Sequence, residues 1–259
     1  MRREEIEKIR DWFRLYVQTF RAPGYGELEH IVLKEKHCVR VSAEMIGLGE
    51  DMDLDESDLI LAGAIGLLHD VGRFEQYSRY GTFVDALSVD HARLGSDIIR
   101  NYGILDGVDR DEQEIIHRAI ISHSGLDLSQ DEDEKTDFFS KLLRDADKLD
   151  IWKVMIDFYS SGGGSEDEAV GLNLPDNGEI SDEVLDDLDE GRSVDAANLR
   201  SQSDFKLLQI GWVYDINFAP AMRRILERRY IEKISSFLPA GEDIAEAVEN
   251  ALEEARRRS

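Results

Sequence analysis

The sequence is poor in cysteine, proline and long apolar runs, and each shortage excludes a class of protein. Its 259 residues include one cysteine, Cys38, so no disulfide can form within the chain. Four prolines and 20 glycines are too few for the many turns of an all-β sandwich. The longest apolar run, Leu59 to Leu68, is half of the roughly 20 residues that a membrane-spanning helix needs. We therefore expect a helical, cytoplasmic protein.

Positive charge is also scarce. Lys and Arg total 31 against 56 Asp and Glu, which gives a net charge of −25. A field of that sign repels nucleic-acid backbones and anionic lipid surfaces, so we expect neither a nucleic-acid polymer nor a membrane as partner. A small phosphorylated substrate stays compatible, because a metal ion or a few cations can invert the potential inside a cleft. The sequence carries no indication of an oligomeric state.

Apolar residues recur at helical spacing along most of the chain, a pattern typical of amphipathic helices. The pattern predicts helices over residues 3–20, 27–46, 58–70, 88–102, 111–122, 136–159, 204–237 and from 241 into the basic C-terminal tail. The helix over 58–70 is apolar on all sides until its last two residues, which places it in the middle of a domain. No stretch alternates as a strand does.

Two stretches interrupt this pattern. Residues 73–87 are rich in aromatics and arginines without clear periodicity, and they predict an irregular segment that follows a helix break at Gly72. Residues 160–195 are glycine-rich and strongly acidic, which predicts a solvated excursion with one short helix near 181–190.

The pair His69-Asp70 ends the apolar helix. A buried histidine beside a buried carboxylate is costly unless both are satisfied, and the usual solutions are a hydrogen-bonded pair or a shared metal ion. The pair alone favours the first solution, because buried polar groups are normally hydrogen-bonded.

Two other residues change that balance. His37 lies on the preceding predicted helix, and Asp147 lies four residues after Leu143 and four before Ile151, so a carboxylate again lies along a buried stripe. Polar groups on three inward helix faces imply a central ligand. Nitrogen and oxygen donors in this mixture suit a divalent transition metal.

The order of these residues resembles a known family. His37 in HCVRV, His69-Asp70 in GLLHDVGRF and Asp147 in RDADKLDIW are similar to the motif blocks of the HD superfamily of metal-dependent phosphohydrolases. The stretch DHARLG at 90–95 also resembles a block of that family. The resemblance implies an all-α HD-domain bundle and a divalent metal, for which Mn, Fe, Co, Ni, Mg and Zn all stay open.

The resemblance also implies a domain organisation. We predict one HD-type domain over residues 1–259, with additional C-terminal helices packed on the core. Its parts are the HD core at about 27–160, the acidic excursion at about 160–200 and the C-terminal helices at about 204–255.

The number of metal ions depends on three further histidines. Members of the superfamily with two ions take extra ligands from the helices between the HD pair and the last aspartate. His91 matches the first such position, and His117 and His123 are candidates for the second. His123 faces the core by helical spacing, whereas His117 lies about a third of a turn away, where it contacts substrate or solvent. Where some members have two adjacent histidines, this chain has Ser122-His123, so one and two ions both stay open.

A metal held by these residues would activate a water for attack on phosphorus, with Asp70 as a catalytic residue that bridges two ions if both are present. The protein must also supply cations for the phosphate and a proton for the leaving group. Arg73 and Lys148 are the candidates for these catalytic roles.

Candidate substrate contacts are Lys34, Gln76 and Arg79. We predict an enzyme that cleaves a phosphomonoester or phosphodiester of a nucleotide or another small phosphorylated metabolite. The alternatives are a non-catalytic metal- or nucleotide-binding sensor and an HD-fold oxygenase with a two-iron site.

Overall fold

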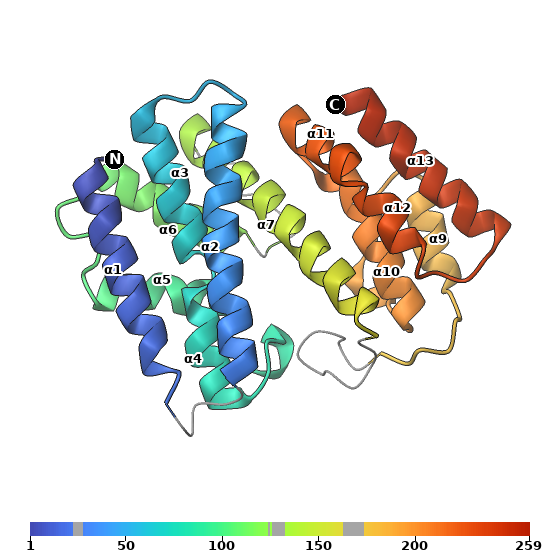
Figure 1. Ribbon diagram of the computed structural model, residues 1–259, viewed down its shortest axis with the longest axis horizontal. Helices are drawn as coiled ribbons and strands as arrows, with labels where there is room; N and C mark the ends of the chain where they lie inside the picture. Colours follow the sequence, from blue (N-terminus) through green and yellow to red (C-terminus); the bar gives the residue numbers. More distant parts are fainter. Residues whose placement is uncertain (23–27, 124, 126–132, 163–173) are drawn as a thin grey trace. The chain divides into compact units, whose positions relative to one another are not determined.

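The computed structural model describes the chain except for residues 23–27, 124, 126–132 and 163–173, and its described residues form helices joined by short segments, with no strand among them (Figure 1). The all-α class predicted from the sequence is confirmed. No helix in these described ranges combines the length and the apolar composition that crossing a membrane requires.

The chain divides into two compact units, Met1–Asp147 and Lys148–Ser259. The boundary falls inside one long helix, α7 (Glu134–Ser160). No feature of the sequence marks a boundary at this point, because the apolar spacing continues through it. The packing of the C-terminal helices on the HD core stays a prediction.

The first unit holds the site residues singled out by the sequence, apart from Lys148, with which the second unit begins. Its helices are α1 (Arg3–Thr19), α2 (Leu28–Glu50), α3 (Glu56–Leu68), α4 (Val71–Tyr80), α5 (His91–Asn101) and α6 (Arg110–Ser122), with a short 3-10 turn η1 (Asp85–Leu87) between α4 and α5. Helices α2 and α3 pack side by side, α3 also contacts α1 and α6, and α5 packs against α4 and α6 (Figure 1). Helix α3 is therefore central to this unit.

The composition of α3 explains that position. From Leu61 to Leu68 every residue is buried, so the helix is covered on all sides, as an apolar surface without a polar face requires. Asp55 caps its N-terminus by accepting a hydrogen bond of 2.9 Å from the backbone N–H of Asp58. The helix ends at Leu68 and leaves His69 as its C-terminal cap.

The prediction of an irregular segment at 73–87 was wrong over its first half, because α4 begins at Val71 and continues to Tyr80. Gly72 is not a helix break. It lies in the first turn of α4, where a Cβ atom would come 2.1 Å from the carbonyl oxygen of His91. The glycine allows the backbones of α4 and α5 to meet.

The second unit contains α9 (Asp182–Asp189), η2 (Ala196–Asn198), α10 (Gln202–Gly211), η3 (Trp212–Asp215), α11 (Ala219–Arg228), α12 (Tyr230–Ser235) and α13 (Glu242–Arg258). The short helix expected near 181–190 is α9, whereas residues 163–173 of the predicted excursion lie outside the described residues.

The helical region predicted over 204–237 contains three short helices, α10, α11 and α12. Pro220 lies in the first turn of α11, and Arg229 has a φ of 55°. Proline begins a helix more readily than it continues one, and a residue with positive φ ends the helix that precedes it. These two residues therefore set the ends of α11.

Candidate metal centre

Six side chains of the first unit converge on a single point. They come from the middle of α2, the end of α3, the junction of α3 and α4, the start of α5, the end of α6 and the middle of α7. They are His37, His69, Asp70, His91, His123 and Asp147.

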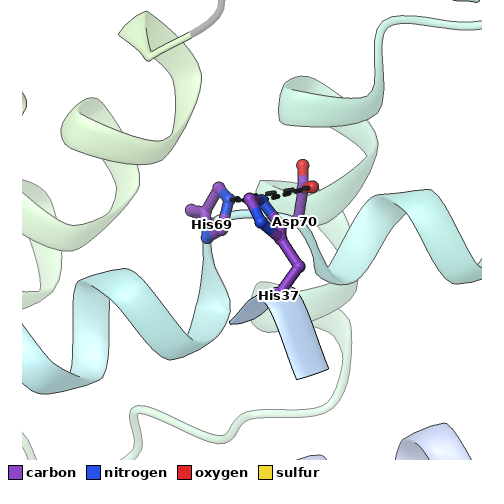
Figure 2. Close-up of side chains that lie close together, drawn as sticks. All are labelled: His37, His69 and Asp70. Carbon is purple, nitrogen blue, oxygen red and sulfur yellow. Dashed lines mark hydrogen bonds and ion pairs between the residues drawn. The ribbon is translucent and has the colours of Figure 1, made fainter. Parts of the chain in front are cut away.

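One half of the cluster surrounds oxygen Oδ2 of Asp70. The Nε2 atom of His37 lies 3.5 Å from this oxygen, 3.2 Å from Nε2 of His69 and 3.0 Å from Oδ1 of Asp147. The Nε2 atom of His69 lies 3.7 Å from Asp70 Oδ2 and 3.6 Å from Asp147 Oδ1. Figure 2 shows His37, His69 and Asp70 turned toward one another. These four residues form one group of donors.

The other half surrounds oxygen Oδ1 of Asp70. The Nε2 atom of His91 lies 3.4 Å from this oxygen and 3.2 Å from Nε2 of His123. The Nε2 atom of His123 lies 3.8 Å from the same oxygen. Asp70 thus offers a different oxygen to each half of the cluster.

The hydrogen bonds of the rings determine which nitrogen faces the cluster. The Nδ1 atom of His69 is 2.8 Å from the carbonyl oxygen of Gly66, and Nδ1 of His123 is 2.6 Å from that of Ile120. A carbonyl oxygen only accepts, so Nδ1 donates its proton in both rings. The neutral ring then presents a bare Nε2 atom, which is the form that binds a metal.

The charge states also suit a cation. Burial opposes ionisation of Asp70, yet the ammonium of Lys34 and the ring of His69 hold the pKa of Asp70 well below its ordinary value. The pKa of Asp147 is likewise held well below its ordinary value despite burial, because the rings of His37 and His69 lie beside its carboxylate. Burial lowers the pKa of His91, and burial together with nearby rings lowers that of His123 to about 3. Ionised carboxylates beside neutral imidazoles are the state that metal ligation requires.

The spacing of the donors provides a test of fit. Ligand atoms about 2.0–2.2 Å from one ion, at tetrahedral or octahedral angles, lie about 2.9–3.6 Å apart, close to the 3.0–3.8 Å separations within each half. Oδ1 of Asp70 and Oδ1 of Asp147 are buried without a hydrogen-bond donor, which is costly for a buried acceptor. The guanidinium of Arg73, with Nε 3.5 Å from Oδ1 of Asp70, offsets part of this cost for Asp70. The cluster fits a divalent metal. Two sets of its donors share Asp70, and His123 of the second set also lies within reach of His69 and Asp147.

A residue that sequence reasoning missed lies behind His91. Oδ2 of Asp85 is 2.6 Å from Nδ1 of His91, while its Oδ1 accepts from Arg73 at 2.7 Å and from Gln76 at 2.8 Å. Asp85 belongs to η1, which has no periodic signal, and it is one of many acidic residues in the chain. The sequence predicted a catalytic role for Arg73 and a substrate contact for Gln76, whereas both side chains donate hydrogen bonds to Asp85.

The other predicted site residues lie in different surroundings. Lys34 Nζ is 2.8 Å from Oδ2 of Asp70, so Lys34 is part of the site. Arg79 is exposed and pairs with Glu75, and the fully buried Gln76 makes its bonds within the protein.

Lys148 and His117 also have partners of their own. Lys148 Nζ lies 2.5 Å from Oδ2 of Asp215. The His117 ring is buried with Nδ1 2.9 Å from Ser96 Oγ, and it is not among the groups that could hold a metal in the described part of the chain. The structure therefore brings His91 and His123, but not His117, to the cluster.

Comparison with known proteins gives a family match over part of the chain. Residues 35–152 match the sequence model of the family described as HD domain. The match begins two residues before His37 and ends within α7, so it contains the six clustered residues. No curated protein and no solved structure matches the chain.

Proposed function

This chain is a member of the HD-domain superfamily through residues 35–152, and we propose on that premise that it is a metal-dependent phosphohydrolase with two divalent ions. Its substrate is a phosphomonoester or phosphodiester of a nucleotide or a similarly small phosphorylated metabolite. The observation that carries the proposal is that His37 and His69 lie beside one oxygen of Asp70, with Asp147 next to both rings, while His91 and His123 lie beside the other oxygen.

When bound, the ions would lower the pKa of a coordinated water and take up charge on a phosphoryl oxygen. The residues of the chain contribute position and charge. Asp70 would bridge the two donor sets through its two carboxylate oxygens, and His37, His69 and Asp147 would hold the first ion. His91 and His123 complete the second set, which leaves room there for ligands from solvent or substrate.

Lys34 is the cation best placed for a phosphate. Its ammonium lies 2.8 Å from Asp70 Oδ2, and a fifth of its side chain is exposed, so one end of the group reaches the cluster while solvent reaches the other. A fixed ammonium beside the reacting phosphoryl group would stabilise the negative charge that develops in the transition state. Lys148 and Arg73 are secondary candidates, because Lys148 pairs with Asp215 and the shortest ion pair of Arg73 is with Asp85, both outside the cluster.

The experiment is an assay of phosphate release. The full chain, purified without chelator, is incubated with a panel of nucleotides, phosphomonoesters and phosphodiesters in Mn²⁺, Co²⁺, Ni²⁺, Mg²⁺, Zn²⁺ or Fe²⁺. We expect metal-dependent turnover that Asp70→Asn and Asp147→Asn reduce at least about 1,000-fold, since each removes a charged ligand. Asp157→Asn is the matched control, because Asp157 lies on the exposed face of the same helix as Asp147 and its side chain pairs with Lys153. Metal binding without turnover across the panel would contradict the proposal and favour a sensor.

One observation favours a second candidate. The two sets of histidine and carboxylate donors also suit iron, which is what an oxygenase with a two-iron site would require. Oxygen consumption that depends on Fe²⁺ and is lost in His91→Gln, without phosphate release under any metal, would support the oxygenase and overturn the phosphohydrolase.

A further inference from the structure

His91 is held from behind by a carboxylate. Its ring is 1% exposed, its Nε2 atom faces Asp70 and His123, and its Nδ1 atom lies 2.6 Å from Oδ2 of Asp85. Because an ionised carboxylate only accepts, this short contact places the ring proton on Nδ1 and leaves Nε2 bare.

The other oxygen of Asp85 is fixed by two donors. Arg73 has no acceptor, so the oxygen of the Gln76 amide must be the atom that faces it, at 2.8 Å. The Gln76 amide nitrogen therefore points to Oδ1 of Asp85, at 2.8 Å, and Arg73 donates to the same oxygen at 2.7 Å. Because two N–H groups point at Oδ1 of Asp85, an NH₂ group, which can only donate, cannot take the place of this oxygen.

We propose that Asp85 is a positioning residue that fixes the tautomer of His91, and that Arg73 and Gln76 orient Asp85 for this role. The proposal rests on the proposed two-ion function of the cluster. A histidine that carries its proton on Nδ1 is ready to ligate through Nε2, whereas the opposite tautomer presents an N–H where a lone pair is needed. The three residues thus prepare the second set of donors before an ion arrives.

The substitution Asp85→Asn tests this logic because it changes one oxygen to NH₂ without changing size. The NH₂ group cannot face the donors Arg73 and Gln76, so it must face His91. There it donates to Nδ1, which moves the ring proton to Nε2. We expect the second ion to bind about 100-fold more weakly, at the upper end of the effect of partners behind a ligand, while the first ion binds as before.

Asp85→Ala is the second variant. It removes the acceptor without adding a donor, so His91 is free to adopt either tautomer. Arg73 keeps its bonds to Gln76 and to the Phe83 carbonyl oxygen, and Gln76 keeps those to Ser88 and Val89. We expect a loss of about 10-fold for the second ion. A purely structural role for Asp85 predicts the reverse order, with truncation worse than the isosteric change.

Asp90→Asn is the matched control. Asp90 precedes His91 and caps α5 by accepting from the backbone N–H of Arg93 at 3.0 Å. Asparagine caps a helix as well as aspartate does, so the variant loses one negative charge near His91, together with the exposed ion pair to Arg93, and keeps the cap. Asp90, Asp85 and His91 also form a group of donors close enough to share an ion. If Asp85 were itself a ligand of an ion in that group, Asp90→Asn would weaken binding as well.

Two measurements on the full chain decide the matter. Nitrogen-15 spectra of labelled histidines, with His91 assigned through His91→Gln, report its tautomer in the metal-free protein at neutral pH. Calorimetric titration with Zn²⁺ reports the number and affinity of bound ions. We expect an Nδ1–H tautomer and two ions in the wild type and in Asp90→Asn, and an Nε2–H tautomer with one tightly bound ion in Asp85→Asn.

The proposal is overturned if the His91 tautomer is the same in Asp85→Asn as in the wild type, if Asp85→Ala loses more affinity than Asp85→Asn, or if the wild type binds no second ion. Neither readout needs turnover. A wild type with the expected tautomer and two ions but no phosphate release would contradict the phosphohydrolase alone.

Discussion

Gly72→Ala is a substitution whose effect follows directly from the contact between α4 and α5. A Cβ atom at position 72 would lie 2.1 Å from the carbonyl oxygen of His91 and 2.7 Å from the backbone nitrogen of Gly95. Both are backbone atoms that no side-chain rotation can move. Ordinary contact begins near 3.4 Å, so the two helices must separate by about 1 Å, an overpacking that costs about 1–3 kcal/mol or more.

Opposing this cost is the gain from replacing a helical glycine by alanine, about 1 kcal/mol. The net expectation is a free energy of unfolding that is lower by up to about 2 kcal/mol. The separation also moves His91 away from Asp70. Metal–ligand distances tolerate only about 0.2 Å, so the second ion should be lost before the first.

Gly95→Ala is the matched control in the same interface. Its Cβ atom would lie 3.3 Å from the nitrogen of Gly72 and 3.4 Å from Val71 Cγ2, which requires only a small adjustment. The assay is urea unfolding of both metal-free variants, followed by Zn²⁺ titration. The reasoning is refuted if Gly72→Ala matches Gly95→Ala both in stability and in affinity for the second ion.

Three further predictions follow from the cluster. Lys34→Met should raise the affinity for the first ion, because no ammonium then competes for Asp70 Oδ2. It should also slow hydrolysis about 10- to 100-fold, which is the value of one hydrogen bond to a charged group. Weaker ion binding in calorimetry would contradict this. The metal-free chain should lose stability as the pH falls from 6.5 toward 3, because the unfolded chain protonates His123 in that range and the folded chain does not. In urea unfolding, the free energy of unfolding of His123→Gln should therefore fall less steeply with falling pH than that of the wild type. An equal dependence on pH would count against a buried neutral ring. Saturating Mn²⁺, at about 100 times its dissociation constant, should stabilise the chelator-treated protein by about 2.7 kcal/mol per ion, and Asp147→Asn should lose the share of the first ion in thermal unfolding.

Helical register alone predicts much of the site. His37 and Asp147 lie on apolar stripes of their helices and His69-Asp70 ends a wholly apolar helix, so a metal cluster was predictable before any contact was known. The structure brings these residues together with His91 and His123. The roles assigned to them stay predictions until ions and turnover are measured.

The remaining features depend on contacts between segments that periodicity does not report. Gly72 looks like a helix terminator in the sequence, because only the approach of α5 shows why a side chain is excluded there. Asp85 lies in a 3-10 turn six residues before His91. The positioning role proposed for it depends on hydrogen bonds from Arg73 and Gln76, which lie 12 and 9 residues earlier in the chain. Arg229 ends α11 with positive φ although no glycine marks the position, whereas Pro220 was a visible signal for a break.

Anomalous diffraction from crystals of the full chain grown with Mn²⁺ tests the central claim most directly. The account predicts two peaks on either side of the Asp70 carboxylate, one in contact with His37, His69 and Asp147 and the other with His91 and His123. A cluster without a peak, or with a single peak that His91 and His123 do not contact, would contradict it.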